Sequence, residues 1–182
     1  MTMCGPTEAG ADERVAGCVL GLVREVDDPE RQGRIKVTYP WLDGEMVSNW
    51  ASIAAPMAGG GRGLFAMPEI DDEVVLSFDR GRMNHPLVVG FTWNGQDATP
   101  DEDRRVRKWQ SVNGHFVMMA DSTPGGGSSG AVVIGDAHGN MVSMGNGVVT
   151  VMSKGVLRLK APSIVLEVGG VSRIVTPSPK PI

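Results

Sequence analysis

The fold is decided by three stretches of sequence: GRIKVTYPWL at residues 33–42, SNWASIAAPMAGGGRGLFAMPEIDDEVVLSF at 48–78 and HPLVVGFTWNG at 85–95. In the first stretch Ile35, Val37 and Tyr39 alternate with polar residues, which is typical of a strand with one buried face. The alternation returns at 74–78, and an apolar run follows at 87–91. Short strands separated by Gly- and Pro-containing turns predict a small five-stranded β-barrel over residues 14–96.

The barrel core is expected to consist of the apolar members of these strands. They are Val37, Tyr39, Val74, Leu76, Phe78, Val89 and Phe91. Cys18 lies within VAGCVLGLV, which predicts a first strand in which this residue is small and buried.

The order of strand and turn residues in the predicted barrel resembles that of a known family. Residues 65–78 follow the order F-x-x-P-x-x-x-D-E-V-x-x-x-F, and HPLVVGF-x-x-NG follows at 85–95. This order is similar to the oligonucleotide/oligosaccharide-binding (OB) barrel of baseplate spike proteins, namely the baseplate assembly protein V of contractile phage tails and the valine–glycine-repeat spike of type VI secretion. The family usually has Gly where this chain has Asp71. Because Asp tolerates left-handed backbone angles, the turn is expected to be kept.

Composition and charge limit the alternatives. The 182 residues include 25 Gly and 12 Pro, which predicts many turns and little helix. The formal net charge of −4 lacks the positive excess that attracts a phosphate backbone, so nucleic acid is not expected as a partner. The sequence has no run of 18 apolar residues and no signal-peptide pattern at its start. We expect synthesis in the cytoplasm and incorporation into the baseplate of a phage-tail-like particle, which is then released or anchored to a membrane.

The remaining sequence predicts four further segments. Residues 1–13 are expected to be a flexible tail, and 97–130 a charged connector followed by the first strands of a needle and a Gly/Ser-rich loop, STPGGGSSG. Residues 131–175 form a quasi-repeat of short strands, AVVIGDA, HGNMVSMGN, GVVTVMSK, GVLRLKAP, SIVLEVGG and VSRIVTP, and 176–182 form a Pro-rich tail.

The quasi-repeat alternates between an apolar and a polar face. The apolar face is expected to comprise Val149, Val151, Leu157, Leu159, Ile164, Leu166 and Val168, and the polar face Thr150, Arg158, Lys160 and Glu167. A single layer of strands leaves one apolar face and two edges uncovered, and three chains around a threefold axis would cover both. The resemblance implies this arrangement, an intertwined triple-stranded β-helix that forms only in the homotrimer. The alternative is a β-meander packed on the barrel.

No residues point to catalysis, a metal or a cofactor. Cys4 and Cys18 are too few for a disulfide framework, and His85, His115 and His138 lack the spacing of metal ligands. The run Asp101, Glu102, Asp103 is interpreted as a solvated connector rather than a catalytic carboxylate pair. Some relatives carry a lysozyme domain, for which this chain has no room. It also has no His-x-His pair at its end, so the iron-bearing tip of some phage spikes is not expected.

The resemblance implies a structural function. The chain is expected to be the central spike of a contractile injection machine, a homotrimer that sits beneath a separate hub protein and other baseplate proteins and pierces the target membrane when the sheath contracts. A conical tip protein of the proline–alanine–alanine–arginine-repeat kind would dock near Val171, Ile174 and Val175; otherwise the Pro-rich end is a frayed tail.

Two other functions are compatible with the sequence. The barrel could be an oligosaccharide- or oligonucleotide-binding module that uses Trp41, Trp50 and Trp93 for stacking. Alternatively, the chain could be a passive trimeric fibre or adaptor of the particle. The particle itself could be a phage, a tailocin, an extracellular injection system or a membrane-anchored secretion machine.

Overall fold

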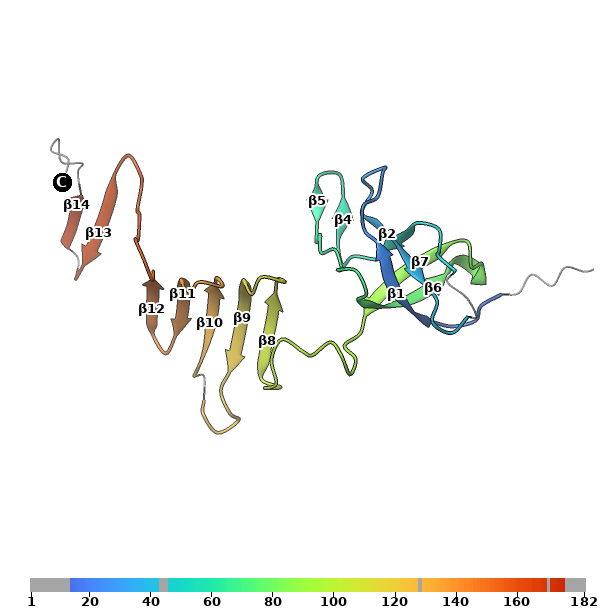
Figure 1. Ribbon diagram of the computed structural model, residues 1–182. Coiled ribbons are helices and arrows are strands. Elements are labelled where there is room, and N and C mark those ends of the chain that lie inside the picture. Colours follow the sequence, from blue (N-terminus) through green and yellow to red (C-terminus); the bar gives the residue numbers. More distant parts are fainter. Residues whose placement is uncertain (1–13, 43–45, 128, 170, 176–182) are drawn as a thin grey trace, which may run out of the picture. The chain divides into compact units, whose positions relative to one another are not determined.

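The computed structural model describes residues 14–42, 46–127, 129–169 and 171–175 (Figure 1). These residues form strands and turns, with one short 3-10 helix at Asp79–Gly81. The chain divides into two compact units, Met1–Thr99 and Pro100–Ile182. The predicted tails at 1–13 and 176–182 lie outside the described residues.

The first unit contains a closed five-stranded barrel, as predicted. Its strands are β1 (Val19–Glu25), β2 (Arg34–Thr38), β3 (Ala51–Ile53), β6 (Glu73–Phe78) and β7 (Pro86–Phe91), arranged in the order β1-β2-β3-β7-β6. All neighbours are antiparallel except β3 and β7, which are parallel. The pair β4 (Ala58–Gly59) and β5 (Arg62–Gly63) makes a separate small hairpin.

The barrel core is built from the inward-facing residues of these strands. Val23, Ile35, Val37, Ala51, Val74, Leu76 and Val88 are fully buried, and Tyr39 and Phe78 are nearly so. Five of the residues expected in the core therefore lie there: Val37, Tyr39, Val74, Leu76 and Phe78.

The prediction was wrong for Val89 and Phe91. Their side chains are 43% and 51% exposed, whereas Pro86 and Val88 point inward. Successive residues of a strand face opposite sides, so burial of Val88 places Val89 outside. Phe91 lies beyond the register irregularity between β6 and β7, where it pairs with Val74, and it remains half exposed at the end of β7. The run Leu87-Val88-Val89 is apolar throughout and gives no alternation from which the inward residue can be chosen.

Two features at the strand ends bear on the sequence predictions. Asp71 adopts a left-handed conformation, with φ of 71°, and its N–H donates to the Val23 carbonyl at 2.9 Å. The residue expected to replace the usual Gly thus keeps the turn. Cys18 was wrongly predicted to be buried: it is exposed, because β1 begins only at Val19.

An ion pair closes the turn between β1 and β2. The Asp28 side chain is only 3% exposed. Its carboxylate accepts hydrogen bonds from Nε and Nη2 of Arg34, at 2.9 and 2.8 Å. It also accepts hydrogen bonds from the backbone N–H groups of Glu30 and Gln32, at 3.0 and 2.9 Å. The hydrogen bond from the Arg34 side chain, followed by those from the backbone, holds the pKa of Asp28 well below its usual value.

This arrangement predicts a pH-dependent contribution to stability. A carboxyl whose pKa is lowered by folding stabilises the fold above its unfolded pKa of about 3.9 and loses that contribution as the pH falls towards the folded pKa. We therefore expect the difference in melting temperature between the native chain and Asp28→Asn to be fully present at pH 6 and to shrink below about pH 4. Asp27→Asn, at the exposed neighbouring carboxylate, is the control. A difference that stays constant down to pH 2 would contradict the assigned role.

The second unit contains a five-stranded antiparallel meander. Its strands are β8 (Val106–Gln110), β9 (Phe116–Asp121), β10 (Gly130–Gly135), β11 (Met141–Gly145) and β12 (Val148–Met152), and their spatial order follows the sequence. The Gly/Ser-rich segment connects β9 to β10. Asn146 and Gly147, both with positive φ, form the two-residue turn between β11 and β12. A separate hairpin consists of β13 (Ile164–Val168) and β14 (Val171–Val175).

The meander differs from the expected arrangement in two ways. Residues 155–162, predicted to form a strand as GVLRLKAP, are not in one. In addition, β9, β10 and β11 have both edges hydrogen-bonded within the chain, whereas strands of an intertwined helix were expected to pair with neighbouring chains. Only the outer edges of β8 and β12 remain open in this sheet.

Candidate interaction face of the five-stranded sheet

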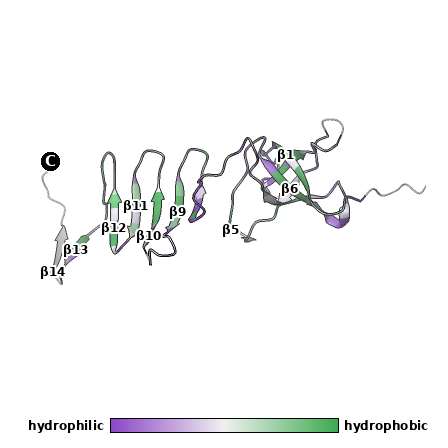
Figure 2. Ribbon diagram, turned by 90° about the horizontal axis from the view of Figure 1, so that it is seen from below, coloured by the Kyte–Doolittle hydropathy of each residue, from purple (hydrophilic) through white to green (hydrophobic). Residues whose placement is uncertain are grey.

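One face of the five-stranded sheet is apolar across its whole width. Paired residues of antiparallel strands point to the same side, so the register defines two rows on this face. One row runs Trp109, Val117, Ile134, Val142, Val151, and the other Arg107, Met119, Val132, Met144, Val149. We call the nine apolar members the apolar face; Figure 2 shows the hydrophobic colouring of β9 to β12.

Every member of the apolar face is exposed to solvent. The exposed fractions run from 38% for Val132 to 68% for Val149. Isolated exposed apolar side chains are common on protein surfaces, but a contiguous patch over five strands is typical of an interaction surface.

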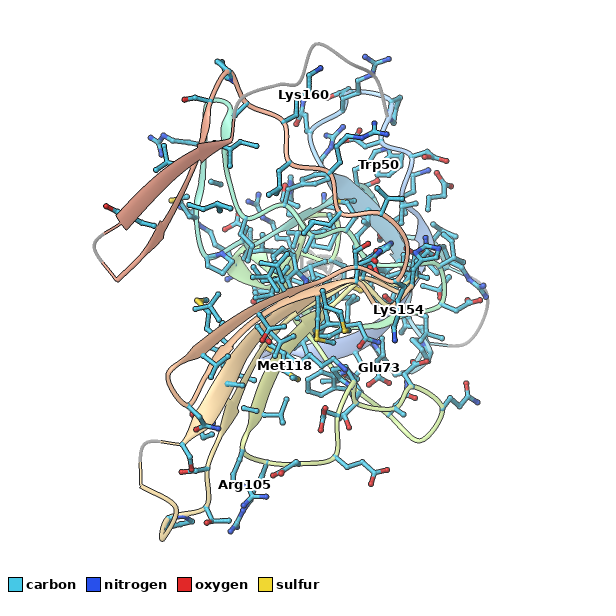
Figure 3. The ribbon with its side chains drawn as sticks, turned by 90° about the vertical axis from the view of Figure 1, so that its left-hand side faces the viewer. Trp50, Glu73, Arg105, Met118, Lys154 and Lys160 are labelled. Atoms are coloured by element: carbon cyan, nitrogen blue, oxygen red, sulfur yellow. The ribbon has the colours of Figure 1, made fainter. Side chains whose placement is uncertain are left out.

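The opposite face is partly covered by its own side chains. Val133 is 9% exposed, and the Phe116 ring lies over Gly135, where a Cβ would come within 2.6 Å of the ring. The Lys108 ammonium lies 5.2 Å from the centre of the same ring. This face also contains Met118, which is half-buried (Figure 3). The polar face was predicted for residues 131–175, and within that range the buried Val133 is an apolar exception.

The residues predicted for the trimer axis fall into three separate places. Val149 and Val151 belong to the apolar face, at 68% and 55% exposure. Leu157 and Leu159 lie outside any strand and are exposed. Ile164, Leu166 and Val168 lie in β13, which pairs only with β14 among the described strands.

Sequence reasoning missed the other seven members of the apolar face: Trp109, Val117, Met119, Val132, Ile134, Val142 and Met144. Alternating apolar residues in KWQ, FVMMAD and AVVIG belong to the apolar face and could have identified it. In these segments apolar residues also occupy the opposite face, so the alternation is not visible in the sequence.

The ends of the sheet carry charge. The Arg107 guanidinium, beside the apolar face, forms an ion pair with Asp121 of β9. At the start of the unit, the Arg105 side chain donates to Asp103 at 2.7 Å and lowers the pKa of that carboxyl to about 2. These exposed pairs keep charge at the border of the apolar face.

The part of the barrel surface around Trp50 offers little to an anionic ligand. Trp50 lies beneath the cations of Arg34 and Lys36, at 5.9 and 4.8 Å from its ring. Arg34 is paired with Asp28 and Glu30, and Lys36 with Glu25 at 3.0 Å. Because carboxylates neutralise both cations, this surface lacks the free positive groove of a single-strand-binding protein.

A cavity lies beside the β4–β5 hairpin. It is an open groove of about 670 Å³ whose lining includes Ile53, Phe65, Met67 and Phe91. Phe65 is 76% exposed. Arg31 and Arg62 also line the groove, so its walls are partly basic.

Metal and membrane features are absent from the described part of the chain. No group of three or more His, Cys, Asp or Glu side chains gathers there, and no helix there is long and apolar enough to cross a membrane. His115 instead accepts a hydrogen bond from the Ala137 N–H through Nδ1, at 3.3 Å. The residues predicted to dock a tip protein, Val171, Ile174 and Val175, lie in β14.

Comparisons with known proteins agree with the barrel and extend into the second unit. Residues 19–93 match the family model of the type VI secretion system/phage-baseplate injector OB domain. The type VI secretion system spike protein VgrG5 of Pseudomonas aeruginosa is 31% identical over 134 residues, which are 69% of this chain and 16% of that protein. The spike protein VgrG3 of Vibrio cholerae is 33% identical over 72 residues, 37% of this chain and 7% of that protein.

A third relative is named as a toxin. The actin cross-linking toxin VgrG1 of Vibrio cholerae is 29% identical over 93 residues, 49% of this chain and 8% of that protein. The chain thus spans at most about a sixth of the length of these relatives. Residues 19–93 form the injector OB domain, and through it the chain belongs to the baseplate spike family.

Proposed function

We propose that this protein is the homotrimeric central spike of a contractile injection machine and that it pierces the target membrane when the sheath contracts. The single observation that carries the proposal is the apolar face, which has nine exposed apolar side chains on five strands. In a single copy that face stays in contact with water, and three copies around an axis would bury it.

Burial of the apolar face in a trimer suits a piercing function. Apolar burial contributes about 25 cal/mol per Å² removed from water, and the face is repeated in each chain. A needle that must not unfold under load depends on slow unfolding, which is favoured when many contacts must break together. In this trimer each sheet forms one wall of a prism.

The partners follow from the same proposal. The barrel unit would join a hub protein at the end of the tail tube and other baseplate proteins, and β14, with Val171, Ile174 and Val175, would dock a conical tip protein. We propose no catalytic residue, metal or cofactor for this chain. Its relatives include spike proteins and one toxin, so an effector activity would be expected from a separate domain.

The mass of the unheated protein, measured by multi-angle light scattering, tests the proposal. We expect about 58 kDa, three times the chain mass of 19.3 kDa. A variant that ends after Asp121 loses most of the apolar face and is expected to be monomeric. A monomeric full-length protein would contradict the spike function.

Location in the particle separates the spike from a passive fibre or adaptor. A spike is found on the tube axis, and a fibre at the baseplate periphery, when the tagged protein is imaged in assembled particles. Salt-dependent binding of an oligonucleotide, or binding of a cell-wall glycan, would instead favour the binding-module alternative.

A further inference from the structure

Three Asn–Gly pairs occur in the chain, and all of them lie outside the strands. They are Asn94–Gly95, Asn113–Gly114 and Asn146–Gly147. Asn is a thermolabile residue, and a following Gly makes it most reactive, because Gly has no side chain to block the approach of its own backbone nitrogen to the Asn side chain. An unfolded chain would expose all three pairs, so the folded structure decides which of them reacts.

Deamidation of an Asn–Gly pair needs two free groups. The Gly backbone nitrogen attacks Cγ of the Asn and forms a new C–N bond, and the side-chain amide nitrogen leaves as ammonia with the proton of the Gly N–H. Water then opens the five-membered succinimide. Opening at Cγ gives Asp, and opening at the main-chain carbonyl gives isoaspartate, in which the backbone runs through the side chain. The reaction therefore requires an Asn side chain that can rotate and a Gly N–H that donates no hydrogen bond.

The Asn94 side chain is held by three hydrogen bonds. Its oxygen accepts the backbone N–H groups of Gln96 and Asp97, at 2.7 and 2.8 Å. Its nitrogen donates to the Asp97 carboxylate at 3.0 Å. All three hydrogen bonds resist the rotation that brings Cγ to the Gly95 nitrogen, so this pair is protected at its side chain.

The Asn113 pair is protected at its nucleophile instead. The Gly114 N–H donates to the Ser111 carbonyl at 2.9 Å. This hydrogen bond must open before the Gly114 nitrogen can attack, although Asn113 itself is exposed.

The Asn146 pair has neither protection. Asn146 and Gly147 are exposed and join β11 to β12 (Figure 1), with φ of 52° and 76°. Within the residues that the structure describes, the Asn146 side chain makes no hydrogen bond and the Gly147 N–H donates none. The flanking residues Gly145 and Val148 pair with each other, which closes the turn without using the Gly147 N–H.

We propose that Asn146 is a modification site at which the folded protein deamidates ahead of Asn94 and Asn113. This property is separate from the spike function proposed above. The Asp product would fit the turn, because Asp tolerates the left-handed conformation of Asn146. Isoaspartate adds one carbon to the main chain of a two-residue turn, so Gly145 and Val148 would lose their register, and β12 would be held less firmly to the sheet.

Peptide mass spectrometry of the aged full-length protein tests the order of reaction. The protein is incubated at neutral pH, folded or in urea, and digested at mildly acidic pH, and each Asn–Gly peptide is scored for the mass gain of deamidation. In the folded protein we expect Asn146 to react about fivefold faster than Asn113, where one hydrogen bond must open, and faster still than Asn94. In urea the three sites should react at similar rates. Equal rates in the folded protein, or a faster reaction at Asn94 or Asn113, would overturn the assignment.

The melting temperature of aged protein tests the effect on the turn. Aged native protein should melt at a lower temperature than fresh protein, in proportion to its isoaspartate content. Asn146→Asp should keep the native melting temperature and lose it much more slowly on ageing, because a carboxylate is a poor electrophile. The matched control, Asn113→Asp, should lose stability on ageing as the native chain does. Loss of stability on ageing that is unchanged in Asn146→Asp would show that another position is responsible.

Discussion

Replacing Val142 by Asp is expected to convert the proposed trimer into monomers. Val142 lies in the middle strands of the apolar face, with Ile134 and Val151 as its paired neighbours. In a trimer the substitution would bring three carboxylates into an apolar interface, and a buried unpaired charge costs several kcal/mol. Each chain alone would keep the Asp in water, since Val142 is 39% exposed.

Ser143→Asp is the matched control for this experiment. Ser143 is the next residue of β11 and points to the opposite face. Light scattering of the two purified variants at equal concentration should give the monomer mass for Val142→Asp and the trimer mass for Ser143→Asp. The reverse result would mean that the apolar face points outward in the assembly.

Replacing Val88 by Ala is expected to destabilise the barrel by about 2 kcal/mol, because the side chain is fully buried and its loss leaves a cavity. Val89→Ala removes the same atoms from the neighbouring position, which is 43% exposed, and should cost less than about 0.5 kcal/mol. The measurement is urea unfolding of the full-length protein at one fixed concentration, followed by tryptophan fluorescence.

The comparison of Val88 with Val89 is informative because the residues are identical and adjacent. Equal losses of stability for the two variants would contradict the inward direction of Val88. A larger loss for Val89→Ala would show that the outer side of β7 is covered in the assembled protein.

The barrel could be predicted because its signals are local. Alternation identified the buried residues of β2 and β6. The left-handed Asp71 was expected because the resembled family has Gly at this position and Asp tolerates the same conformation. Which of Val88 and Val89 faces inward depends on how β7 pairs with β6, including the register irregularity between Val75 and Leu76. The local sequence of β7 does not reveal this pairing.

The second unit was harder to predict for a related reason. Periodicity shows that GVLRLKAP could be a strand, but whether it becomes one depends on a partner, and the alternation does not say whether that partner is in the same chain. The position of the Lys154 backbone depends on Asn140, fourteen residues earlier, whose side-chain oxygen accepts the Lys154 N–H. Likewise, the full apolar face appears only when the pairing of five strands is known.

The sequential order of β8 to β12 also bears on the order in which this protein folds and then associates. Each strand pairs only with the one before and the one after it, so no long loop has to close while the sheet forms. A sheet of this kind can form rapidly within one newly made chain by adding strand to strand. In the proposed trimer the slow step is then the meeting of three chains, so the yield of trimer should rise steeply with the concentration of the protein at synthesis.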